Sequence, residues 1–188
     1  MPKISIIIPV LGQKWYTDAI LADIPLKVKS EYEIIVLDWH DSVNFKWNKG
    51  VEQAKGEYIW IINNDLILTE WLDIELVALL DTYKIACPFT TEWRDKFMLP
   101  KIKNTTRRNI AWWCFMQKKD DWIQIDNRLD LYYGDNWIFE KHKGNIGWGW
   151  LCHHFRSSTI KTMDISKRIR KDNLTWHVIC DEQWWDNY

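Results

Sequence analysis

Two aspartates each follow a short apolar run, and their positions suggest a nucleotide site. Asp38 closes "YEIIVLD", and Asp65 ends "EYIWIINND" after Asn63 and Asn64. If the two runs are neighbouring strands of an open α/β sheet, both carboxylates lie at the edge where such sheets bind ligands. Carboxylate and amide oxygens suit Mg2+ or Mn2+, and a cation would offset the cost of burying a charge. The alternative for each aspartate is a turn that caps its strand.

The rest of the chain supplies elements that would position these groups. Short apolar runs alternate with segments of helical periodicity in the first half, which is typical of a parallel α/β sheet. We expect six strands, at 3–10, 32–38, 57–63, 84–89, 110–117 and 147–155. We expect helices at 13–23, 45–56, 68–83 and 118–125, one beginning near residue 135, and a tail from about 166 to 185. Residues 91–109 are polar and lack a period, which predicts a long connection.

Composition limits the classes of partner and compartment. The 188 residues carry 25 basic and 26 acidic side chains, so no strong positive field favours nucleic acid. No apolar stretch is long enough to span a bilayer. The four cysteines are far apart and form no CxxC pair, which favours reduced core residues and a cytoplasmic protein.

Six segments in order resemble the inverting family 2 glycosyltransferases with the A-type fold. They are "ISIIIPV", "EIIVLDWHDS", "NKGVEQAKGEYIWIINND", "AWWCFMQKKDDW", "YYGDNWIFEKHKG" and "HHFRSST". The resemblance covers nearly the whole chain. It implies a single α/β domain with a mostly parallel central sheet flanked by helices. Within it, 1–90 would be the nucleotide-binding half, 91–160 the acceptor and catalytic half, and 161–188 a helical tail.

The resemblance also implies a donor site. Pro9 and Val10 match the loop that touches the nucleotide, and Asp38 matches the acid that binds the uracil-type base. Asn48 and Lys49, in the family's Asn-x-Gly pattern, would lie near the diphosphate.

The family's D-x-D metal motif falls on Asn63, Asn64 and Asp65, with Asp65 as the retained metal ligand. Asn63 replaces the usual first aspartate, which lowers the negative charge of the site. A histidine commonly completes the family's metal shell, and the spacing to "SST" favours His154 over His153. The implied cofactor is Mn2+ or Mg2+.

The family's catalytic base is usually the aspartate of a Glu-Asp or Gly-Asp pair that opens a helix, and here the pair matches Gly134 and Asp135. A carboxylate there would take the proton of the acceptor hydroxyl. The alternative is that Asp135 only caps the helix. Sugar stacking and charge neutralisation have further candidates: Trp112, Trp113, Tyr132, Tyr133 and Trp137 for stacking, and Lys49, Arg107, Arg108 and Arg156 as counter-charges.

The expected activity is metal-dependent, inverting transfer of a sugar from a UDP-sugar donor to an acceptor hydroxyl. The acceptor class stays open between a glycan, a protein and a modified nucleobase, and an oligomer could complete the acceptor site. A sugar nucleotidyltransferase would favour a glycine-rich phosphate loop, whereas "PVLGQKW" has one glycine. A tryptophan-rich carbohydrate-binding module is a second alternative, although such modules are usually all-β.

Overall fold

The computed structural model describes residues 3–11, 14–39, 42–92, 113–143, 145–154 and 166–184, with the backbone alone at 90–92, 150, 151, 154, 183 and 184. Within these ranges, the strands form one seven-stranded sheet in the order β2-β1-β3-β6-β5-β7-β4. The strands are β1 (Ile4–Pro9), β2 (Tyr32–Leu37), β3 (Tyr58–Ile62), β4 (Leu66–Ile67), β5 (Ile85–Glu92), β6 (Cys114–Lys118) and β7 (Ile146–His154).

The sheet is mostly parallel, as the sequence predicts. Strand β6 is antiparallel to both of its neighbours, β3 and β5, and β4 is antiparallel to β7. The other five strands therefore run in one direction. The two-residue strand β4 is an addition that the sequence pattern did not predict, because so short a strand carries no periodicity.

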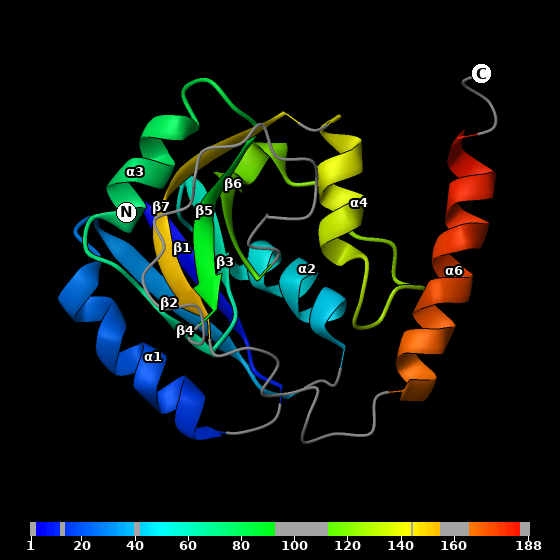
Figure 1. The fold of residues 1–188 in the computed structure, drawn as a ribbon, viewed down its shortest axis with the longest axis horizontal. Coiled ribbons are helices and arrows are strands. Elements are labelled where there is room, and N and C mark those ends of the chain that lie inside the picture. Colours follow the sequence, from blue (N-terminus) through cyan, green and yellow to red (C-terminus); the bar gives the residue numbers. More distant parts are fainter. Residues whose placement is uncertain are drawn as a thin grey trace.

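Helices cover both faces of the sheet (Figure 1). Helices α1 (Lys14–Lys27) and α3 (Leu72–Leu79) pack on one face, where Ile20, Ile24 and Leu76 join β-strand side chains in one buried cluster. Helices α2 (Val43–Gln53) and α4 (Gly134–Lys141) pack on the other. Helix α6 (Ser166–Trp184) stands beside α4 and contributes Ile179 to that second cluster.

Burial on both faces explains why the central strands β1 and β3 read as continuous apolar runs. In β1, Ile6 faces the α1 and α3 side whereas Ile7 faces the α2 side, and both are fully buried. Helix α2 lies very close to this strand, because a β-carbon on Gly50 would come 2.4 Å from Cγ2 of Ile7.

Two expected helices are shorter than the sequence predicts. The expected helix at 68–83 begins only at Leu72, after Trp71 in a left-handed conformation with φ 69°. The expected helix at 118–125 is a single 3-10 turn, η2 (Lys119–Asp121), and the following residues are irregular. The connection expected at 91–109 lies outside the described residues from 93 onward. Among the described helices, none is both long and apolar enough to cross a membrane.

Candidate functional site

The carboxyl ends of the central strands bring several predicted residues to one edge of the sheet. Pro9 pairs with Leu37, so Val10 and Asp38 are the next residues along neighbouring strands, and the Val10 amide donates to the Leu37 carbonyl at 2.9 Å. Pairing of Ile7 with Ile61 puts Asn63 level with Pro9 on the other side. Asp38 is exposed at this edge.

The antiparallel strand β6 starts at the same edge and adds an aromatic side chain. Ile62 pairs with Cys114, and the Asn63 amide donates to the Trp113 carbonyl at 2.8 Å. Trp113 is only partly buried. It therefore lies beside the predicted metal motif, although the two segments are fifty residues apart in the sequence.

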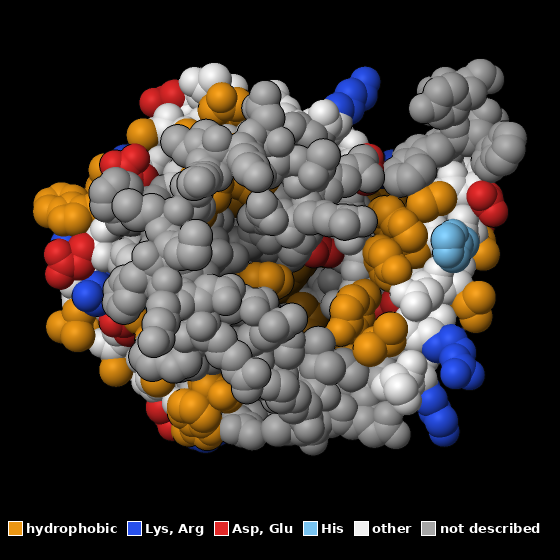
Figure 2. Space-filling view, in the orientation of Figure 1, with side chains coloured by type: hydrophobic (Ala, Val, Ile, Leu, Met, Phe, Trp, Pro, Cys, Tyr) orange, Lys and Arg blue, Asp and Glu red, His pale blue; other side chains and the backbone are white. Residues whose placement is uncertain are grey.

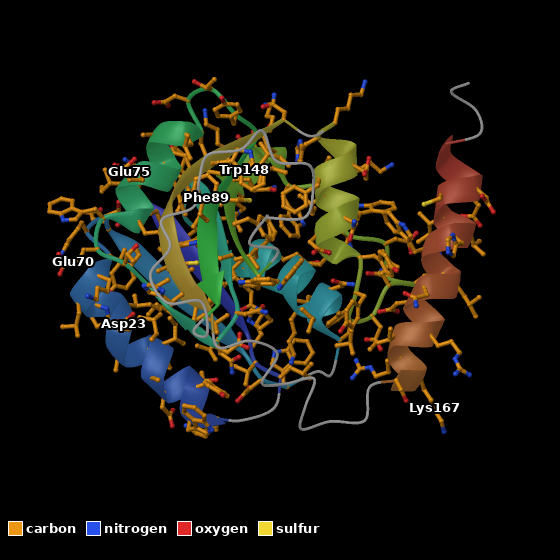
Figure 3. The ribbon with its side chains drawn as sticks, in the orientation of Figure 1. Asp23, Glu70, Glu75, Phe89, Trp148 and Lys167 are labelled. Atoms are coloured by element: carbon orange, nitrogen blue, oxygen red, sulfur yellow. The ribbon has the colours of Figure 1, made fainter. Side chains whose placement is uncertain are left out.

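The turn at Asn63, Asn64 and Asp65 is tied to helix α1. The Asn64 side-chain amide donates to Oγ1 of Thr17 at 3.0 Å, and both residues are buried. On the other side of the turn, the Leu68 amide donates to the Asp23 carboxylate at 3.0 Å, and Figure 3 shows Asp23 on α1. Asp65 is 4% exposed. The turn is thus a fixed structure, with its aspartate held at the sheet rather than in a mobile loop.

The pairing of β4 with β7 places the backbone of His154 beside this turn. Leu66, the residue after Asp65, pairs with His154. Among the described side chains, no group of three or more His, Cys, Asp and Glu residues could hold a metal ion. A divalent ion bound with a nucleotide, however, commonly takes one or two protein ligands and completes its shell with phosphate oxygens and water. The residues present therefore fit an ion that binds together with a diphosphate.

A lysine that sequence reasoning missed lies beneath this edge. Lys46 of α2 is 1% exposed and donates from Nζ to the Val10 carbonyl at the end of β1. The predicted Lys49 is instead partly exposed and pairs with Glu52 at 2.6 Å. The spacing in the sequence indicates the burial of Lys46. Lys46 precedes Gly50 by four residues, so both lie on the helix face that contacts the sheet.

Asn48 binds a neighbouring segment through both ends of its side-chain amide. Its Nδ2 donates to the Ile125 carbonyl at 2.9 Å, and its Oδ1 accepts from the Ile125 amide at 3.0 Å. Asn48 is 4% exposed. These two contacts hold Ile125 against α2, and they bind its amide to Asn48 rather than to a helical carbonyl.

Asp135 lies in the first turn of α4 and is not the cap of that helix. The cap position belongs to Tyr133, whose φ is 65°, and Asp135 Oδ1 accepts from the Asn136 amide at 2.9 Å. Desolvation raises the pKa of Asp135 to about 6, even though its backbone hydrogen bonds act in the opposite direction. A carboxylate with this pKa can accept a proton near neutral pH.

Gly134 joins this carboxylate to the amino end of α2. A β-carbon on Gly134 would lie 2.0 Å from Oδ1 of the fully buried Asn44. Ser42, four residues after Asp38, caps α2 by accepting from the Phe45 amide at 3.1 Å. The starts of α2 and α4 therefore meet close to the end of β2.

The predicted stacking aromatics have different surroundings. Trp137 is 8% exposed, belongs to the core cluster under α4 and has the Lys141 ammonium 4.7 Å from its ring, so a sugar cannot stack on it there. Tyr133 already stacks on Trp176, with ring centroids 5.1 Å apart. Sequence reasoning missed Trp39, which is 58% exposed directly after Asp38. The side chains of His154 and of Trp112, Arg107, Arg108 and Arg156 lie outside the described set.

The space-filling view shows a hollow near the start of α4 and over α2, with hydrophobic side chains and an acidic group visible inside it (Figure 2). One ring pair lies on the sheet: Phe89 of β5 and Trp148 of β7 have ring centroids 6.0 Å apart and are labelled in Figure 3.

Comparison with known proteins shows the fold. No family model matches the chain, and no curated protein sequence matches it. Among solved structures, it is similar to S. aureus TarS in complex with UDP-GlcNAc, with a TM-score of 0.61 and 10% identity over 90% of this chain and 64% of that one. It is also similar to glucosyl-3-phosphoglycerate synthase from Mycobacterium tuberculosis in complex with Mn2+ and UDP-glucose, with a TM-score of 0.63 and 10% identity over 93% of this chain and 78% of that one.

Both of these proteins are glycosyltransferases with the A-type fold, and the chain described here has that fold. The chain spans 60 to 64% of the length of the TarS chains that it matches.

Proposed function

We propose that the protein is a metal-dependent glycosyltransferase that moves a sugar from a UDP-sugar to an acceptor hydroxyl with inversion. One observation carries the proposal: Val10, Asp38, Asn63 and Asp65 meet at one carboxyl edge of a glycosyltransferase A-type sheet. The similar structures support the donor class, because the TarS structure holds UDP-GlcNAc and the glucosyl-3-phosphoglycerate synthase structure holds UDP-glucose with Mn2+.

In this proposal the edge residues bind the donor. The nucleobase of the donor binds at the ends of β1 and β2. There Asp38 accepts a hydrogen bond from the nucleobase, and Trp39 has an exposed ring. Asp65 and His154 would hold the divalent ion, which would supply Lewis-acid stabilisation of the leaving diphosphate. The buried Lys46, which donates from Nζ to the Val10 carbonyl, lies under the same edge.

Asp135 is the proposed base for transfer. It takes the proton from the acceptor hydroxyl as that oxygen forms its bond to the anomeric carbon. The bond from the anomeric carbon to the diphosphate oxygen breaks on the opposite face, so its electron pair leaves with the nucleoside diphosphate. Attack opposite the leaving group inverts the anomeric centre.

We also propose the expected division into a nucleotide-binding half at 1–90, a catalytic half at 91–160 and a helical tail at 161–188. The cytoplasm is the proposed compartment. Its support is chemical, because Cys87, Cys114, Cys152 and Cys180 are all free thiols.

Metal-dependent donor binding tests this function. Calorimetric titration with UDP, UDP-glucose and UDP-GlcNAc, with and without Mn2+, is expected to show saturable binding that needs the ion. Asp65→Ala is expected to abolish that dependence. Glu75→Ala is the matched control, because Glu75 is an exposed carboxylate on α3 (Figure 3). No binding of any uridine nucleotide by the wild type would contradict the proposal.

The expected product is the nucleoside diphosphate. Release of pyrophosphate from a nucleoside triphosphate and a sugar phosphate would instead establish a nucleotidyltransferase. Saturable binding of oligosaccharide without any nucleotide would favour the carbohydrate-binding alternative.

A further inference from the structure

A buried aspartate of α6 accepts three consecutive backbone hydrogen bonds from the segment that leads into α4. Asp172 Oδ1 accepts from the Asp130 amide at 3.0 Å, and Oδ2 accepts from the amides of Leu131 and Tyr132 at 2.7 and 2.8 Å. Asp172 is fully buried. Three convergent N–H donors stabilise a buried carboxylate, and the carboxylate in turn fixes the backbone that supplies them.

Helix α6 holds the same segment, residues 130–133, through its side chains as well. Arg168 donates to both carboxylate oxygens of Asp130, from Nε at 2.7 Å and from an Nη at 2.8 Å. These hydrogen bonds lower the pKa of Asp130. The Tyr133 hydroxyl donates to Asn173 Oδ1 at 2.6 Å, one helical residue after Asp172.

Helix α2 holds the opposite side of this segment. Ser42 Oγ and the Asn44 amide both donate to the Asp130 carbonyl, at 2.8 and 3.2 Å. Asn44 Nδ2 donates to the Tyr132 carbonyl at 3.0 Å. The amides of 130–132 thus point to α6 while two of their carbonyls point to α2, so the segment is fixed from both sides.

The segment 130–132, which is held between α2 and α6, lies directly before the proposed catalytic base, Asp135. Tyr133 is the left-handed residue that starts α4, and Asp135 follows two residues later. A shift of residues 130–132 would therefore move the start of the helix and its carboxylate together. Displacement of a reacting group by about 1 Å is enough to slow an enzyme about 100-fold.

We propose that Asp172 is a positioning residue for sugar transfer: it fixes residues 130–132 and thereby sets the place of the Asp135 carboxylate relative to the acceptor. The inference rests on the proposed role of Asp135. In this proposal α6 contributes to catalysis although it does not contact the donor.

Asp172→Asn tests the proposal, because it keeps the shape of the side chain but replaces one accepting oxygen with an N–H group that faces donors. We expect kcat for transfer to fall about 100-fold while KM for the donor stays within about twofold. Glu182→Gln is the matched control: it removes a carboxylate from the same helix, but one that is exposed and pairs with Arg128 at 2.9 Å. The control is expected to keep the wild-type kcat.

A second pair of variants covers the case in which Asp172→Asn does not fold. Arg168→Ala is expected to lower kcat at constant donor KM, whereas Lys167→Ala is not, since Lys167 is exposed and points away from α4 (Figure 3). A folded Asp172→Asn variant with wild-type kcat, or with a change in donor KM alone, would overturn the proposal.

Amide exchange separates this inference from the proposed function. Wild-type protein that transfers no sugar would refute the function, and hydrogen exchange at 130–132 would then decide whether Asp172 fixes the segment. Faster exchange at these three amides in Asp172→Asn than in Glu182→Gln supports the anchor. Equal exchange rates in the two variants would overturn it.

Discussion

Asn44 and Gly134 are packed so tightly that a β-carbon on the glycine would stand 2.0 Å from the Asn44 side-chain oxygen. This contact joins the amino end of α2, which follows the proposed nucleobase-binding Asp38, to the amino end of α4, whose first turn contains the proposed catalytic Asp135. We predict that Gly134→Ala separates the two helices, lowers the free energy of unfolding by about 1–3 kcal/mol and lowers kcat. Thermal unfolding and initial rates would measure both effects.

Gly149→Ala is the control for that substitution. A β-carbon on Gly149 would meet Leu79 Cδ1 at 2.9 Å, which is the end of a flexible side chain that can turn away. It should therefore cost less than Gly134→Ala. Equal losses in the two variants would show that the Asn44 contact has no special importance.

Removing the proposed base should abolish transfer but not donor binding. For Asp135→Asn we predict that kcat falls by a factor of about 100 to 10,000, because the amide cannot accept the hydroxyl proton. The dissociation constant for UDP-sugar should stay close to that of the wild type. Wild-type turnover by this variant would remove Asp135 from the reaction.

The pH dependence of transfer should follow the same carboxylate. Desolvation raises the pKa of Asp135 to about 6, so the base is protonated below that pH and ionised above it. We predict that kcat rises with pH through about 6 and reaches a plateau above it. A rate that is flat between pH 5 and 7, measured in buffers of constant ionic strength (about one pH unit either side of that pKa), would argue against this base.

Stability should change with pH in the opposite direction. The folded protein holds the Asp135 proton more tightly than the unfolded chain, whose carboxyl has a pKa of about 3.8. Between these two values the folded state binds more protons, so raising the pH from about 4 to about 6 lowers stability. Asp135→Asn should therefore stabilise the protein at pH 7, by at most about 3 kcal/mol, and have little effect below pH 4. Chemical denaturation at both pH values would measure it.

The Asn48 side chain should contribute mainly to stability. Asn48→Ala removes both hydrogen bonds to Ile125 and leaves a buried amide and carbonyl without their partner, which should cost about 2–4 kcal/mol. Asn145→Ala is the comparison, because the Asn145 side chain is exposed and accepts a long, 3.3 Å bond from the Lys84 amide. A similar small loss for both variants would contradict the assigned role.

The sequence predicted the strand ends well because local chemistry determines them. Asp65 follows β3, which is buried on both faces, and Asp38 follows β2, a half-buried apolar strand at the edge of the sheet. Both apolar runs are visible without a structure. The placement of Trp113 was not predictable in the same way. That placement depends on β6 running antiparallel to its neighbours, and a short apolar run does not indicate the direction of a strand.

Contacts between distant segments account for most of what could not be predicted. Asn48 and Asp172 both looked like ordinary polar residues of helices, yet each binds backbone groups far away in the sequence. The sequence does not distinguish a buried polar side chain from an exposed one of the same type. Only the fold shows which carboxylate, among 26 acidic residues, has three amides pointing at it.

The sequence separation between Asp172 and its three amide donors also affects how the chain folds during synthesis. Residues 130–132 are synthesised 40 to 42 positions ahead of Asp172. At about 5–20 residues per second, the ribosome needs at least about two seconds to deliver the missing acceptor. In a nascent chain whose sheet has already folded, these amides would still lack the Asp172 carboxylate as their acceptor. Arrest peptides placed before and after α6 would thus separate an inactive early form from a competent late one.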